Sequence, residues 1–174
     1  MIRGIHHTSL TTANLEDSVR FYSTLIGCEK VMDAEWHCVP EADLIVGLTD
    51  ASAKGVILKT GNSYLELLQY NWPVPRPLDP IPLACDIGLR HICFDVVDIE
   101  FEYERLSKEG VEFLSAPQEM FSMMKSCYGR DPDGNIFELQ ELTKADTGLG
   151  IELLDFVRDE ILQMGEEILQ VGES

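Results

Sequence analysis

Residues 134–139, Gly-Asn-Ile-Phe-Glu-Leu, decide the fold because they repeat an earlier stretch of the chain. That earlier stretch is residues 61–67, Gly-Asn-Ser-Tyr-Leu-Glu-Leu. The segments that open the two copies also correspond, since Gly-Ile-His-His at 4–7 matches Gly-Leu-Arg-His at 88–91. Internal similarity of this kind indicates a repeated structural unit. We therefore expect two copies of one unit, each beginning with a histidine and closing with a glutamate.

Each copy predicts the same order of elements, namely one strand, one helix and three further strands. Residues 4–12 and 88–97 are expected to form the first strands, because they hold β-branched and aromatic residues and no proline. Each helix is expected to start at a residue that can cap free backbone amides and to end at a glycine. These residues are Asn14, Gly27, Asp98 and Gly110. The remaining strands are expected near residues 28–33, 54–60, 63–70, 111–114, 124–130 and 135–141. The predicted fold class is α+β, built as two βαβββ modules.

Strand alternation predicts which side chains share a face of each sheet. The apolar residues expected to pack beneath the helices are Leu65, Leu67, Phe137 and Leu139. The opposite face then carries two histidines and two glutamates, namely His7, Glu66, His91 and Glu138. A single residue of either type is usually structural or solvated. Four ligand-type residues at repeat-related positions instead favour a divalent-metal site with nitrogen and oxygen donors.

Composition and charge exclude several classes of partner. The 174 residues include 31 acidic and 13 basic ones, and the net charge of −18 opposes binding to nucleic acid and anionic lipid. The chain has no apolar run of roughly 18 residues, and its start lacks the apolar stretch of a signal peptide. Its five cysteines form no Cys-x-x-Cys pair, so a reducing cytoplasm is the simplest setting. We therefore expect a cytoplasmic protein that binds neither nucleic acid nor membranes.

Several short motifs occur together in an order and spacing that resemble a known family. They are His7 followed by Asn-Leu-Glu-Asp-Ser-Val-Arg-Phe-Tyr at 14–22, Leu-Ile-Gly at 25–27, Tyr-Leu-Glu-Leu at 64–67, Arg-His-Ile at 90–92 and Arg-Asp-Pro-Asp-Gly-Asn-Ile-Phe-Glu-Leu at 130–139. On these motifs, residues 3–142 resemble the vicinal oxygen chelate superfamily. That superfamily includes glyoxalase I, methylmalonyl-CoA epimerase, extradiol dioxygenases and bleomycin-resistance proteins.

The resemblance implies an open, eight-stranded cleft around one divalent metal ion. His7, Glu66, His91 and Glu138 match the family's four ligand positions, which are all filled as in glyoxalase I and the epimerase. Because those enzymes move a proton next to a carbonyl, the resemblance implies a metal-dependent isomerase or lyase acting on a small thioester or thiohemiacetal. Glu66 and Glu138 are then also the catalytic candidates that take and return the proton. The donor set suits nickel, cobalt, manganese, iron or zinc.

Two other functions stay open on the sequence. An iron-dependent extradiol-type dioxygenase would consume oxygen with a catechol, and a drug-resistance-type protein would bind a small molecule without catalysis. The cations that could bind carboxylate or phosphate groups of a substrate are Arg3, Arg76, Lys125 and Arg130. The residues that could line its pocket are Trp36, Met120, Phe121, Met123 and Met124.

The expected domain covers residues 1–148, with module one at 3–70, a proline-rich connector at 71–87 and module two at 88–142. Residues 149–174 are expected to form a C-terminal amphipathic helix, because apolar residues recur there at spacings of three and four. These residues are Leu154, Val157, Ile161, Met164, Ile168 and Val171. This apolar face needs a cover, either from the chain's own sheets or from a second subunit. Because members of the family are often dimers, we expect a homodimer to which the tail contributes.

Overall fold

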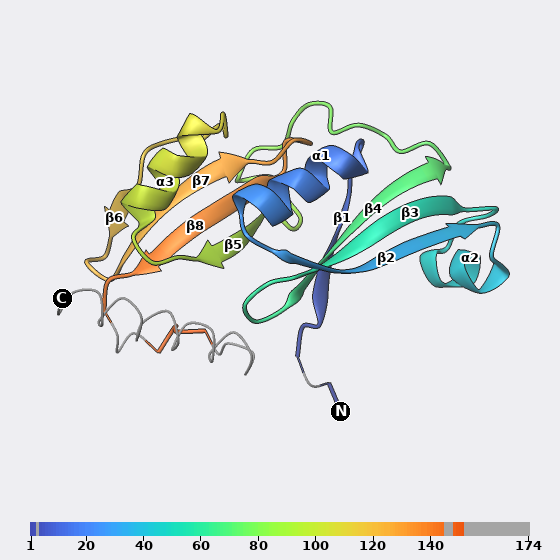
Figure 1. Ribbon diagram of the computed structural model, residues 1–174, viewed down its shortest axis with the longest axis horizontal. Coiled ribbons are helices and arrows are strands. Elements are labelled where there is room, and N and C mark those ends of the chain that lie inside the picture. The colour runs from blue at the N-terminus through green and yellow to red at the C-terminus, as the bar shows by residue number, and fades with distance from the viewer. Residues whose placement is uncertain (3, 145–147, 152–174) are drawn as a thin grey trace, which may run out of the picture.

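Each half of the chain forms one four-stranded sheet (Figure 1). The computed structural model describes residues 1–2, 4–144 and 148–151. The first half contains β1 (His7–Thr11), α1 (Leu15–Val19), the π-helix η1 (Arg20–Leu25), β2 (Glu29–His37), α2 (Pro40–Val46), β3 (Ser52–Lys59) and β4 (Tyr64–Trp72). The second half contains β5 (His91–Asp95), α3 (Ile99–Lys108), β6 (Gln118–Met120), β7 (Met124–Arg130) and β8 (Ile136–Leu142).

Both sheets have the same topology. The strand order is β1-β4-β3-β2 in the first sheet and β5-β8-β7-β6 in the second. In each sheet the first strand runs parallel to the last, while all other neighbours are antiparallel. The structure therefore confirms the α+β class and the two βαβββ modules expected from the internal repeat.

The helices begin and end at the residues predicted to bound them. The Asn14 side chain accepts hydrogen bonds from the first backbone amides of α1, and the Asp98 carboxylate does the same for α3. After the helices, Gly27 and Gly110 have φ angles of 92° and 88°. Glycine adopts such positive values without the steric cost that a Cβ atom would add.

One strand lies elsewhere than expected. Residues 111–114 do not form the predicted strand, because only Phe113 makes an isolated bridge there, to Gly129. The edge strand of the second sheet is β6 instead. Pro117, which has no amide to donate, interrupts the chain between that bridge and β6.

The short helix α2 was not expected either. Its boundary signals are nevertheless in the sequence, since Pro40 is its first residue and Gly47 follows its last with a φ of 67°. Leu44 and Ile45 of α2 are 84% and 85% exposed, so no buried apolar stripe marks this helix. That is why apolar periodicity alone did not predict it.

A single apolar core joins the two modules. The residues predicted to face inward, Leu65, Leu67, Phe137 and Leu139, are each at most 2% exposed, which confirms the alternation. The helix of the first module packs on the sheet of the second, where the Phe21 and Phe137 ring centroids lie 5.5 Å apart. Figure 1 shows α1 between the two sheets. The faces opposite this core carry the predicted ligands.

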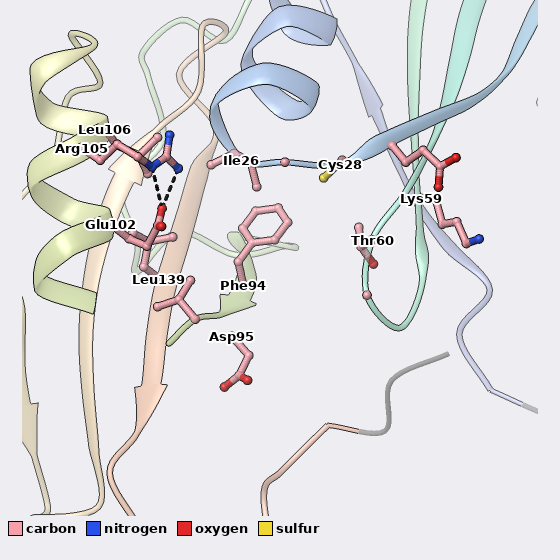
Figure 2. Close-up of a pocket in the computed structure, with 14 residues that line it drawn as sticks. Ile26, Cys28, Lys59, Thr60, Phe94, Asp95, Glu102, Arg105, Leu106 and Leu139 are labelled. Atoms are coloured by element: carbon pink, nitrogen blue, oxygen red, sulfur yellow. Dashed lines mark hydrogen bonds and ion pairs between the residues drawn. The ribbon is translucent and has the colours of Figure 1, made fainter. Parts of the chain in front are cut away.

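A cavity of about 280 Å³ remains between the modules on the helix side (Figure 2). Apolar Phe94 and Leu139 line it from the second sheet, and Ile26 lines it from the first module. The Cys28 thiol also borders the cavity, and burial raises its pKa to about 11. This thiol therefore stays protonated at neutral pH, as expected of a packed structural cysteine.

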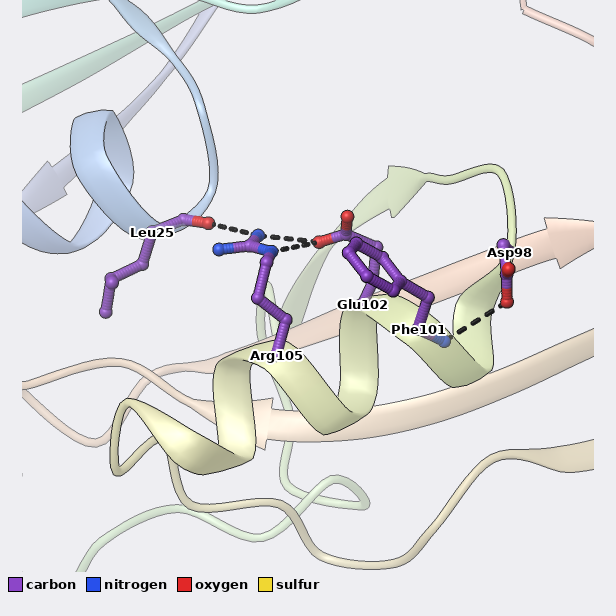
Figure 3. Close-up of polar contacts among 5 residues, drawn as sticks. All are labelled: Leu25, Asp98, Phe101, Glu102 and Arg105. Carbon is purple, nitrogen blue, oxygen red and sulfur yellow. Dashed lines mark hydrogen bonds and ion pairs between the residues drawn. The ribbon is translucent and has the colours of Figure 1, made fainter.

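Arg105 of α3 joins the two modules at the edge of this cavity (Figure 3). Its Nη2 atom donates to the carbonyl oxygen of Leu25, at 2.6 Å, and to the Glu102 carboxylate, also at 2.6 Å. Leu25 is the last residue of η1, and the carbonyls at a helix end lack partners within the helix. A cation that binds one of them stabilises the helix end and its position against the second module.

None of the described helices is long and apolar enough to cross a membrane. The amphipathic helix predicted for the C-terminal segment lies outside the described residues, except for positions 149–151.

A buried hydrogen bond also crosses between the modules. The Tyr22 hydroxyl of η1 donates to Oδ2 of Asp131, at 2.9 Å, in the loop between β7 and β8. Tyr22 is 1% exposed, and burial together with the Asp131 charge raises the pKa of its hydroxyl. Burial likewise raises the pKa of Asp131, whose carboxylate also accepts from Asn135. These two side chains are therefore stabilised by their hydrogen bonds within the protein rather than by contact with water.

Replacing Tyr22 with phenylalanine should lower the free energy of unfolding by about 1–2 kcal/mol, because a buried carboxylate loses one of its donors. Urea unfolding followed by circular dichroism measures the change. Tyr103→Phe is the matched control, since its ring packs 4.9 Å from Phe113 and its hydroxyl has no hydrogen-bond partner among the described residues. This control should change stability by less than about 0.5 kcal/mol. Equal effects of the two variants would contradict the role given to the Tyr22 hydroxyl.

Candidate functional site

The four predicted ligands occupy matching places in the two sheets. In each sheet the histidine is the first residue of the first strand. The register partner of His7 is Tyr64, and that of His91 is Ile136. In each sheet the glutamate lies two residues beyond that partner on the last strand. Because the register is the same in both sheets, Glu66 has the same position relative to His7 as Glu138 has relative to His91. Each sheet therefore presents one histidine and one glutamate on the face opposite the core.

The second sheet holds its pair in direct contact, and we call this pair the β5–β8 half-site. His91 Nε2 lies 3.1 Å from Oε2 of Glu138. The other carboxylate oxygen, Oε1, accepts a short hydrogen bond from the Ser126 hydroxyl of β7. Glu138 is only 9% exposed. Because each of its oxygens has a partner, the carboxylate is held in one orientation beside the imidazole.

Two further side chains complete the surroundings of Glu138. Cys93 is its register partner on β5, and the Tyr128 ring lies 5.1 Å from the His91 ring. Loss of water around the sulfur and the charge of Glu138 raise the pKa of the Cys93 thiol to about 12. Partial burial, with smaller contributions from Glu138 and Cys93, also raises the pKa of Tyr128. Both groups are therefore uncharged at neutral pH, and Glu138 supplies the negative charge.

The first sheet carries the other pair, His7 and Glu66, which we call the β1–β4 half-site. His7 is exposed, and its Nδ1 atom lies 3.0 Å from Nδ1 of His6. The His6 ring stacks on Tyr64 with a centroid distance of 5.1 Å. Glu66 is half-buried, and its charge adds to burial in raising the pKa of Tyr70 on the same strand. This half-site is the more open of the two.

The two half-sites are separate within the chain. Over residues 1–2, 4–144 and 148–151, no group of three or more His, Cys, Asp and Glu side chains lies close enough to hold a metal ion. The structure thus brings His91 and Glu138 together. Assembly of all four predicted ligands around one ion stays a prediction.

The candidate substrate cations differ in their contacts. Lys125 forms an ion pair with Glu100, at 2.6 Å, and Arg130 donates to the carbonyl oxygens of Gly134 and Pro82, at 2.6 and 3.1 Å. These two side chains are engaged in holding the fold. Arg76 instead lines a groove of about 610 Å³. Arg3 lies outside the described residues.

The candidate pocket residues fall into two groups. The Trp36 ring on β2 lies perpendicular to that of Tyr70, with a centroid distance of 6.0 Å. Both belong to the first sheet, where Trp36 and Tyr70 are each paired with Ala53 of β3. The cluster on the second sheet is more open, since Met120 and Phe121 are exposed while Met123 and Met124 are half-buried.

Ser126 and Tyr128 were missed by the sequence analysis. The alternation of residues 124–130 places both on one face of β7, and Tyr128 is the register partner of Glu138. The signal was present in the sequence, but it needs the β7–β8 register to connect these two residues with Glu138.

Comparison with known proteins identifies relatives that cover most of the chain. Residues 4–139 match the model of the glyoxalase/bleomycin resistance protein/dioxygenase superfamily. The metallothiol transferase FosB from Shouchella clausii is 26% identical over 151 residues, which cover 84% of this chain and 85% of that protein. A 2-epi-5-epi-valiolone epimerase from Actinomyces sp is 31% identical over 121 residues, which cover 66% of this chain and 64% of that protein. A glyoxalase family protein from Bacillus cereus has a similar structure, with a TM-score of 0.75 and 21% identity over 83% of this chain and 97% of that one.

Cys93 should react slowly with iodoacetamide at pH 8 although it is exposed, because a pKa of about 12 leaves little of the reactive thiolate. Replacing Glu138 with glutamine removes the neighbouring negative charge, so it should lower the pKa of Cys93 and speed alkylation. Peptide mass spectrometry in the presence of a chelator measures the rate at each cysteine. The exposed Cys38, whose thiol lies 3.7 Å from His37, is the internal control and should not respond to Glu138→Gln. An unchanged Cys93 rate in that variant would contradict the electrostatic coupling.

Proposed function

Because the chain belongs to the glyoxalase/bleomycin resistance protein/dioxygenase superfamily, we propose that it is a metal-dependent isomerase or lyase. The superfamily includes metal-dependent enzymes. The proposed reaction moves a proton next to the carbonyl group of a small thioester or thiohemiacetal. The observation that carries the proposal is the His91–Glu138 pair, held by Ser126 and matched in register by His7 and Glu66. The similarity to an epimerase supports proton transfer as the reaction type.

The residues fit a divalent ion by their donor chemistry. Two imidazoles and two carboxylates offer nitrogen and oxygen donors of the kind used by nickel, cobalt, manganese, iron and zinc. The Ser126 hydrogen bond orients Glu138, as partners beyond the ligands do in metal sites. A divalent ion held by His7, Glu66, His91 and Glu138 would supply Lewis acidity to a carbonyl oxygen.

The two glutamates take different parts in the proposed reaction. Both oxygens of Glu138 have partners, which restricts movement of its carboxylate and suits it to hold position. Glu66 lies on the more open half-site, so its carboxylate has room to take the proton next to the carbonyl and return it. Glu66 and Glu138 therefore remain the two catalytic residues, with Glu66 as the leading proton carrier.

We propose that the protein acts as a homodimer. The two sheets share one core, so the two ligand-bearing faces lie on the far sides of their sheets. A second copy of the chain allows the β1–β4 half-site of one copy to meet the β5–β8 half-site of the other. Two-fold symmetry would then form two equivalent sites, each with all four ligands.

A second candidate function is the metal-dependent transfer of a thiol to a small electrophile. The 26% identity with a metallothiol transferase over 84% of the chain favours it. The same four ligands would serve this reaction, but a thiol would be consumed and no hydrogen next to a carbonyl would exchange with solvent. The measurement of proton exchange described below separates the two functions.

His7→Ala and His91→Ala should each abolish stoichiometric binding of the divalent ion, because each removes one of four ligands. Elemental analysis of the purified variants, after incubation with each of the five candidate metals, is the measurement. His37→Ala is the control, since His37 lies on β2 away from both half-sites, and it should keep wild-type metal content. Full occupancy in both ligand variants would exclude the proposed site.

Glu66→Gln should slow exchange of the hydrogen next to a substrate carbonyl with deuterated water by a factor of about 10² to 10⁴. Nuclear magnetic resonance of a turned-over thioester or thiohemiacetal measures the exchange. Glu138→Gln should also slow the exchange. It should reduce metal content too, because the Glu138 carboxylate is a proposed ligand positioned beside His91. Glu104→Gln on α3, whose side chain is 68% exposed, is the control and should exchange at the wild-type rate. Turnover that consumes molecular oxygen would contradict the proposed reaction. Turnover without exchange of the hydrogen next to the carbonyl would contradict it as well.

A further inference from the structure

A groove of about 610 Å³ lies where the proline-rich connector passes the ends of β1 and β4. Its wall is largely apolar, with Val74, Leu78 and Ile81 from the connector. These three side chains are 73%, 44% and 53% exposed, so the groove is open to solvent. A volume of this size is within the usual range of about 300–1,000 Å³ for small-molecule sites.

Two residues that line the groove belong to the ligand-bearing face of the first sheet. Thr11 lines it from β1, on the same face as His7, and Tyr70 lines it from β4, on the same face as Glu66. Tyr70 lies four positions after Glu66 on β4, which corresponds to about 13 Å along a strand. An extended small molecule can therefore reach from the half-site into the groove.

Arg76 gives the groove a positive charge. It lies between Pro75 and Pro77, and both prolines restrict the backbone around it, so little backbone entropy is lost when the side chain binds a ligand. Arg76 has no hydrogen bond or ion pair with any residue in the described part of the chain, although acidic residues outnumber basic ones by 31 to 13. Its guanidinium is thus available to a carboxylate or phosphate, which it binds in a bidentate manner.

Among the described residues that line the groove, Asp133 is the only carboxylate, and it is already engaged. Its Oδ1 accepts from the Ala13 amide at 2.9 Å, and its Oδ2 accepts from the Ser18 hydroxyl at 3.3 Å. Asp133 therefore serves to join the loop before β8 to the start of α1. The Trp36 ring packs against Tyr70, with a centroid distance of 6.0 Å, and its buried Nε1 has no hydrogen-bond partner among the described residues.

We propose that this groove binds the far end of the substrate, and that this end is an organic anion with an apolar body. Arg76 binds the carboxylate or phosphate, while Tyr70 and the apolar connector residues cover the body. The inference rests on the proposed function in placing the reacting carbonyl at the half-site. The binding of the anion itself does not depend on the metal.

The test is a titration of the full chain with 4-phenylbutanoate and with its neutral analogue 4-phenylbutanamide, in the presence of a chelator. Amide chemical shifts measured by nuclear magnetic resonance give both the affinity and the location. The acid should bind at least about tenfold more tightly than the amide, and amide shifts should centre on Val74, Arg76, Leu78 and Tyr70. Arg76→Ala should remove this preference, Arg76→Lys should keep part of it, and the exposed Arg20→Ala on η1 should keep it fully.

Equal affinity for the acid and the amide would overturn the proposal, as would an Arg76→Ala variant that binds like wild type. Shifts confined to another surface would overturn it too. Because the titration uses metal-free protein, failure of the metal site would appear in elemental analysis and leave this result unchanged. A positive titration together with a protein that binds no metal would support the groove and refute the proposed reaction.

Discussion

The first module's helix packs on the second module's sheet, and this contact joins the two halves of the chain. Phe21 packs on Phe137, Tyr22 donates to Asp131, and Arg105 binds the carbonyl of Leu25. These contacts create one core from two repeated units, so each sheet has one face committed to packing. Alternation along the strands then leaves the histidines and glutamates on the other faces, where they are available for chemistry.

The two half-sites have the same register but different surroundings, and this difference suits them to different roles in the proposed reaction. Glu138 is nearly buried and bonded at both oxygens, whereas His7 and Glu66 stand on a more open face. A fixed half-site can hold an ion, while an open one can admit a substrate and move a proton. The groove at Arg76 includes Thr11 and Tyr70 from the face that carries the open half-site, which is consistent with a substrate that approaches from the first sheet.

The sequence predicted those features that depend on local pattern. The repeat predicted two βαβββ modules, and alternation predicted that Leu65 and Phe137 would be buried and that Glu138 would lie opposite them. The sequence could not show that Ser126 binds Glu138, because predicting that contact requires knowledge of the register between β7 and β8. Nor could it distinguish Arg76 from Lys125, whose ion pair with Glu100 joins residues that are 25 positions apart. The helix α2 was not predicted because its apolar side chains are exposed, so its sequence has no periodic apolar pattern.

In the proposed dimer, each metal site is assembled from the half-sites of two copies of the chain. Co-expression of His7→Ala and His91→Ala chains with different affinity tags, followed by isolation of the mixed dimer, tests it most directly. Each variant alone should bind no ion, whereas the mixed dimer should hold about one ion, half of the wild-type content, because one of its two sites keeps all four ligands. A mixed dimer without metal, or the absence of any dimer, would contradict the account.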